Sequence, residues 1–136
     1  MTLKATELRI GNYVMFNDNY ELSLDDPAYY EDMKMFPIDV IASDETIRLM
    51  DGDKSIGCFG TNQIKPISIT EEWLIKFGFE KIDGYYQYPI AMNCKLIFID
   101  GSMQLQTDDD RIIKHIKHIH QLQNLYFALT GKELTI

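Results

Sequence analysis

The chain has 136 residues, of which 46% are hydrophobic and 12% aromatic, and its formal net charge at pH 7 is −8. A chain of this length and composition can bury a core of its own, which excludes disorder throughout and removes the need for a structural metal or disulfide. The negative charge repels nucleic-acid phosphates, and the 13 Lys and Arg residues are scattered along the chain.

The cysteines and the N-terminal residues indicate a reducing compartment. Cys58 and Cys94 have neither CxxC spacing nor a histidine at zinc-finger distance, so we expect two reduced thiols. The first residues lack the apolar run of a signal peptide, and no apolar stretch approaches the ~20 residues that span a bilayer. We therefore expect a cytoplasmic protein without membrane association, and the sequence indicates no cofactor.

The first half of the chain has the pattern of a small antiparallel sheet. Residues 13–16 form a run of β-formers, and three further short alternating stretches follow before residue 60. Turn signals at residues 44–45 and 51–52 join those three stretches as consecutive hairpins. The pattern predicts an SH3-like antiparallel β meander or barrel in a first subdomain, residues 1–66.

A long acidic segment, residues 17–35, interrupts this sheet. The simpler interpretation is a solvated loop. The functional interpretation is a recognition surface, in which tyrosines act as amphipathic anchors and carboxylates steer a basic partner. The candidate partner-binding residues of the segment are Tyr29, Tyr30, Asp25, Asp26, Glu31 and Asp32.

The second half predicts a helix–antiparallel sheet–helix unit in a second subdomain, residues 67–136. Thr70 is placed to cap a short helix that Gly78 ends. Hairpin signals at residues 83–84 and 100–101 then separate three or four antiparallel strands. The predicted fold class is therefore α+β, with the two subdomains packed as one compact unit.

The C-terminal helix is the clearest predicted element. Its apolar residues recur at the spacing of one helical face: Leu122, Leu125, Tyr126 and Leu129. Gly131 follows where such a helix ends, and Leu134 is placed to fold back on its last turn. The start of the helix stays open. Either Asp108 or Asp109 caps an extended helix, or residues 112–117 form a strand and the helix starts near Ile119.

The three histidines, His115, His118 and His120, form a candidate metal site. On a helix His115 and His118 share a face, and on a strand His118 and His120 do. Either pair offers two ligands, but no HExxH pattern supplies a base and a third ligand. The simpler interpretation, which we prefer, is that solvent-facing His and Lys alternate with buried Ile.

A group of tyrosines, Tyr85, Tyr86 and Tyr88, is the other candidate surface. Alternation puts Tyr86 and Tyr88 on one face of a strand and Tyr85 on the other. Stacking of nucleic-acid bases would need interleaved basic residues, which this stretch lacks. Packing within the sheet is the preferred interpretation.

The block HQLQNLYFALTGKEL (residues 120–134) is the most specific stretch of the chain, and LRIGNYV (8–14) and TEEWL with FGF (within 70–79) are less distinctive. These blocks resemble a family of small uncharacterised proteins from Bacteroides-type bacteria and their phages or mobile elements. The resemblance implies a cytoplasmic accessory protein of phage or mobile-element context. It implies no activity, cofactor or catalytic residue.

Together these observations predict a non-catalytic binding or accessory module for a protein partner. The alternative is a nucleic-acid-associated accessory protein, acting by direct binding or by acidic mimicry of DNA. A third possibility is a metal-dependent enzyme that uses the histidine cluster. It ranks last because no group of residues combines a nucleophile, a base and an orienting side chain.

Overall fold

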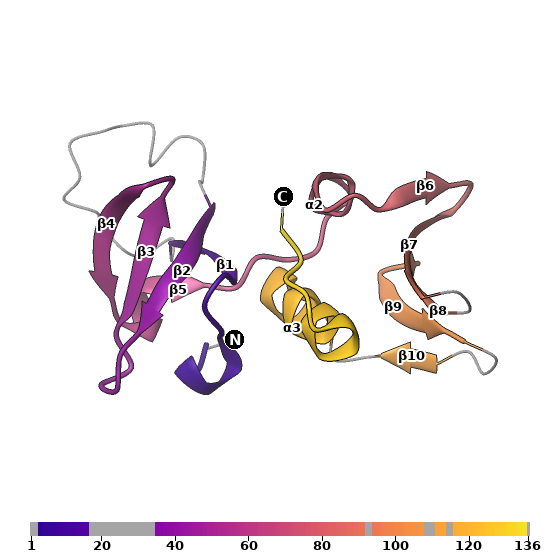
Figure 1. Ribbon diagram of the computed structural model, residues 1–136. Helices are drawn as coiled ribbons and strands as arrows, with labels where there is room; N and C mark the ends of the chain where they lie inside the picture. Colours follow the sequence, from indigo (N-terminus) through magenta and orange to yellow (C-terminus); the bar gives the residue numbers. More distant parts are fainter. Residues whose placement is uncertain (1–2, 17–34, 92–93, 108–110, 114–115, 136) are drawn as a thin grey trace. The chain divides into compact units, whose positions relative to one another are not determined.

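The computed structural model describes residues 3–16, 35–91, 94–107, 111–113 and 116–135 (Figure 1). These residues have the predicted α+β fold: an antiparallel half-barrel, then a helix, an antiparallel sheet and a C-terminal helix. The chain divides into two compact units, Met1–Ile67 and Ser68–Ile136.

The first unit is a curled antiparallel sheet of five strands in the order β4-β3-β2-β1-β5. Its elements are η1 (Ala5–Glu7), β1 (Tyr13–Phe16), β2 (Met35–Ile41), β3 (Ile47–Asp51), β4 (Lys54–Phe59), η2 (Thr61–Gln63) and β5 (Ile64–Lys65). Each predicted strand of this half of the chain is present. β5 ends directly before Pro66, which has no N–H to donate to a strand ladder.

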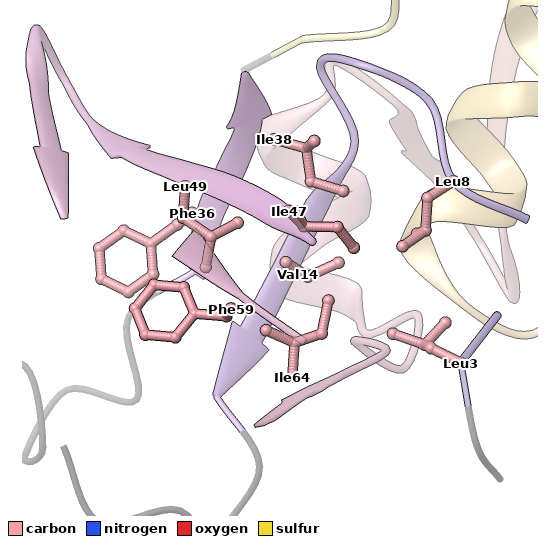
Figure 2. Close-up of a cluster of buried hydrophobic side chains, with 9 residues drawn as sticks. All are labelled: Leu3, Leu8, Val14, Phe36, Ile38, Ile47, Leu49, Phe59 and Ile64. Carbon is pink, nitrogen blue, oxygen red and sulfur yellow. The ribbon is translucent and has the colours of Figure 1, made fainter. Parts of the chain in front are cut away.

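Among the described residues of the first unit, nine buried apolar side chains form a core cluster (Figure 2). They come from the N-terminal residues and from all five strands: Leu3, Leu8, Val14, Phe36, Ile38, Ile47, Leu49, Phe59 and Ile64. Ile47 and Leu49 are both 0% exposed, as the alternation of β3 predicts. Burying one such side chain stabilises a fold by roughly 1.5–3 kcal/mol. The cluster therefore gives the first unit a stabilising core of its own.

The second unit begins with the short helix α2 (Glu71–Lys76). Thr70 caps the helix as predicted, since its Oγ1 accepts a hydrogen bond from the Trp73 N–H at 3.4 Å. Trp73 and Leu74 are buried. A helix this short is not stable alone, so the burial of these two side chains is what holds it in place.

The sheet of the second unit has five antiparallel strands in the order β10-β9-β8-β7-β6. Its strands are β6 (Glu80–Ile82), β7 (Tyr85–Ala91), β8 (Cys94–Ile99), β9 (Ser102–Gln106) and β10 (Arg111–Ile113). The predicted hairpin turns join β6 to β7 and β8 to β9. In the second turn, Asp100 and Gly101 have φ of 51° and 77°. Positive values at both positions characterise the type I′ turn, whose twist matches that of the strands.

Helix α3 (Ile119–Thr130) starts at the later of the two predicted positions. Arg111–Ile113 form β10, which pairs antiparallel with β9, so the extended helix from Asp108 or Asp109 is wrong. The β-branched residues of this stretch favour an extended backbone, and the neighbouring strand offers it hydrogen-bond partners. Asp108 and Asp109 themselves lie outside the described residues.

The buried face of α3 differs from the predicted apolar stripe. The fully buried residues of the helix are Ile119, His120, Leu122 and Gln123. By contrast, Leu129 is 39% exposed and Leu125 is only half-buried. The spacing of apolar residues alone does not indicate this face, because the face includes polar side chains with partners inside the unit.

The residues after α3 fold back as predicted. Gly131 adopts the left-handed conformation, with φ of 73°, and its N–H donates to the Phe127 carbonyl at 2.8 Å. Leu134 is buried, and Gln123 Nε2 donates to its carbonyl oxygen at 3.1 Å. This contact gives the buried Gln123 amide a partner and fixes the end of the chain on the helix.

Candidate functional site

One face of the second sheet carries the candidate site. Side chains alternate between the two faces of a strand. Leu96 and Met103 are 0% exposed and belong to the core of the unit. Their neighbours Lys95, Ile97 and Gln104 lie on the opposite side, which we call the open face.

The open face is hollowed around β8. The hollow has a volume of about 270 Å³ and is lined by Tyr85, Lys95, Ile97, Ile99, Gln104 and Gln106. Ile97 is 8% exposed and forms its floor, whereas the other lining residues are half-buried. Whole-ligand sites commonly measure roughly 300–1,000 Å³, so the size of this hollow suits a few anchoring side chains of a larger partner.

The strand register sets amides beside a charge and beside an apolar side chain. Lys95 pairs with Gln106, and Ile97 pairs with Gln104, across β8 and β9. Directly opposed residues of antiparallel strands have Cβ atoms roughly 4.5–5.5 Å apart. The hollow therefore contains a Lys–Gln row and an Ile–Gln row, separated by one repeat of the pleat, roughly 7 Å.

Lys95 is held by a chain of hydrogen bonds across the open face. Its Nζ donates to Gln87 Oε1 at 3.2 Å, and Gln87 Nε2 donates to Glu80 Oε2 at 3.3 Å. Within the described part of the chain, no carboxylate contacts the Lys95 ammonium. An ammonium group has three donors, so Lys95 keeps donors for an acceptor from outside the chain.

The other polar groups of the hollow are also available. Among the residues that the structure describes, the Tyr85 hydroxyl and the amides of Gln104 and Gln106 have no side-chain hydrogen bond. Each amide offers two N–H donors and one acceptor oxygen. The hollow thus joins an apolar floor to a rim of unused donors and acceptors.

Tyr86 and Tyr88 lie on the opposite sheet face from Tyr85, as alternation predicts. The ring of Tyr88 packs edge-to-face on Tyr126, with centroids 5.4 Å apart and planes at 87°. Tyr86 shares a hydrogen bond with Glu71, which raises the pKa of Tyr86 and lowers the pKa of Glu71. Both rings therefore take part in contacts within the second unit.

Two of the three candidate metal-binding histidines lie at the start of α3, and His115 lies outside the described residues. The rings of His118 and His120 stack with centroids 5.9 Å apart. Burial, with a smaller effect from the charge of His118, lowers the pKa of His120 to about 4. In the described residues no group of three His, Cys, Asp or Glu is placed to hold a metal, so the pair gains no third ligand there.

Residues 17–34 of the acidic segment, the predicted partner-binding surface, lie outside the described residues, which resume at Met35 in β2. This holds for all six candidates: Tyr29, Tyr30, Asp25, Asp26, Glu31 and Asp32. Their role stays a prediction.

The hollow could not be predicted from the sequence, because its lining matches no motif. The sequence does carry one signal for this face, namely which side chains occupy every second position of two neighbouring strands. Lys95, Ile97 and Ile99 occupy every second position of one strand, and Gln104 and Gln106 do so in the next. Gln is mostly exposed in folded proteins whereas Ile is most often buried, so Ile97 and Ile99 are the unusual members of this face.

Comparisons of the chain with protein-family models, with curated proteins and with solved structures found no match. Among the described residues, no helix is both long and apolar enough to cross a membrane.

Proposed function

We propose that this chain is a non-catalytic binding module that recognises a protein partner through the open face of its second sheet. The observation that supports this most is the hollow over β8. There the floor of Ile97 and the half-buried Ile99 lie beside side chains with unused hydrogen-bonding groups. A polypeptide brings both apolar side chains and backbone donors and acceptors, which this combination suits.

The chemistry of the lining favours binding over catalysis. Glutamine amides do not titrate, so Gln104 and Gln106 cannot act as a general acid or base. Lys95 and Tyr85 are the lining side chains that could act as nucleophiles; Lys95 contacts the neutral amide of Gln87, and the Tyr85 hydroxyl has no side-chain hydrogen bond among the described residues. Among the described residues, neither side chain contacts a base that would activate it as a nucleophile.

Nucleic-acid association is the alternative. Tyr85 offers an aromatic ring and Lys95 a cation within one hollow. A phosphate backbone, however, requires several cations, and Lys95 is the single cation among the lining residues of a chain with net charge −8. Acidic mimicry of DNA has support only from composition.

The cellular context of the module is also part of the proposal. The C-terminal block at residues 120–134 resembles small proteins of Bacteroides-type bacteria and their phages or mobile elements. We therefore place the module in the cytoplasm, as an accessory protein of phage or mobile-element origin.

Comparative affinity capture from a native host tests the proposal. The bait proteins are the wild type, Gln104→Arg, and the matched control Ser43→Arg, which adds the same charge at an exposed turn of the first unit. A partner protein should be recovered with the wild type and with Ser43→Arg but lost with Gln104→Arg, whose melting temperature should be unchanged. Equal recovery with all three baits, or recovery of nucleic acid alone, would contradict the proposal.

A further inference from the structure

The positive charge of Lys95 indicates which chemical group of the partner occupies the hollow. Its ammonium is positioned by Gln87, at 3.2 Å, while Glu80 lies one amide further along the same chain. The positive charge is therefore oriented but not neutralised by direct contact within the described part of the chain. A carboxylate from a partner would gain a charge-assisted hydrogen bond, roughly twice as strong as a neutral one.

The rest of the lining suits the surroundings of such a carboxylate. Gln106 is the cross-strand neighbour of Lys95, and its amide can donate to the second carboxylate oxygen. One pleat repeat along β8, Ile97 and its neighbour Gln104 offer an apolar contact and a hydrogen-bonding group. Lys95 and Ile97 are two residues apart on one strand, so they lie roughly 7 Å apart.

An extended peptide presents every second side chain to one side at this same spacing. A peptide lying along β8 would therefore set an acidic side chain at Lys95 when an aliphatic side chain, two residues away, sits at Ile97. Resting on the proposed function, we infer that the open face binds an extended peptide segment of the partner that carries Asp or Glu two residues from an aliphatic residue, with Lys95 as the group that selects the carboxylate.

The net charge of the chain makes Lys95 the main source of attraction for an acidic peptide. A net charge of −8 opposes the approach of an acidic peptide at long range. The attraction must then arise at contact distance, from Lys95. Removal of this one charge should abolish the preference for an acidic residue rather than weaken it slightly.

Selection from a library of short random peptides displayed on phage tests the inference, with wild type, Lys95→Gln and Lys95→Arg as targets. Peptides selected by the wild type should be enriched in Asp or Glu two residues from an aliphatic residue. A synthetic peptide of that sequence should lose about tenfold in affinity or more towards Lys95→Gln and retain most of it towards Lys95→Arg. Replacing its acidic residue by the corresponding amide should cause the same loss, with no further loss in the Lys95→Gln protein.

The outcomes separate the inference from the proposed function. Selected peptides whose binding is lost with Gln104→Arg could still lack an acidic residue or bind Lys95→Gln as well as the wild type. Such peptides would overturn the inference and leave the open face as the binding surface. Peptides insensitive to Gln104→Arg would overturn both. A selection that returns no binding peptide would overturn the inference, while affinity capture would still test the proposed function.

Discussion

The ring of His120 stacks on the ring of His118, with the two planes 19° apart, although His120 is 0% exposed. A buried imidazole beside a second imidazole is stable only while it is neutral, because burial and the charge of the neighbour both oppose its protonation. We therefore expect the stability of the second unit to depend on pH.

Acidification from pH 6.5 to about pH 4 should therefore destabilise the second unit. The folded pKa of His120 is about 4, below the ordinary value of 6.5. The unfolded chain thus binds the proton more tightly, and the stability present above pH 6.5 is lost as pH falls towards 4. The difference between the pKa values of His120 in the folded and the unfolded chain corresponds to about 3 kcal/mol of unfolding free energy.

Urea unfolding at several pH values, followed by the fluorescence of Trp73, measures this effect, since Trp73 is the single tryptophan of the chain and lies in the second unit. The variant His120→Gln should lose the part of the pH dependence that the imidazole causes. A His120 ring signal that titrates near 6.5 in the folded protein would show the explanation to be wrong.

Leu122 and Leu129 should differ sharply in their contributions to stability. Leu122 is 0% exposed, so Leu122→Ala should cost about 2–5 kcal/mol. Leu129 lies on the same helix but is 39% exposed, so Leu129→Ala should cost less than about 1 kcal/mol. The same urea titration compares the two variants, and equal losses would contradict the buried face assigned to α3.

The chain should not bind generic duplex DNA at physiological salt. Its net charge is −8 and its basic residues are scattered, so few phosphates can be neutralised at once. A gel-shift series with the wild type checks this expectation. Submicromolar binding at physiological salt would favour the nucleic-acid alternative instead.

Local chemistry explains why much of the fold could be predicted from the sequence. Asp100 and Gly101 take the positive φ values that their hairpin turn requires, and Thr70 caps α2 through its own hydroxyl. The fully buried face of α3 was harder to predict, because Gln123 is buried through a hydrogen bond to Leu134, which lies beyond the helix.

The candidate site depended on information that single residues do not carry. Lys95 and Gln106 become neighbours only through the register of β8 and β9, and nothing in either residue alone indicates a hollow. The start of α3 posed a similar problem. The competition between a strand and a longer helix was decided by the pairing of Ile112 with Gln104.

Chemical-shift mapping on the ¹⁵N-labelled chain is the most direct test of the open face as the binding surface. The titrant is a peptide selected from the library described above. We predict that the largest changes occur at the backbone amides of residues 95–99 and 104–106, and that Gln104→Arg removes them. Changes confined to the first unit, for example at residues 47–59, with residues 95–106 unaffected, would contradict the assignment.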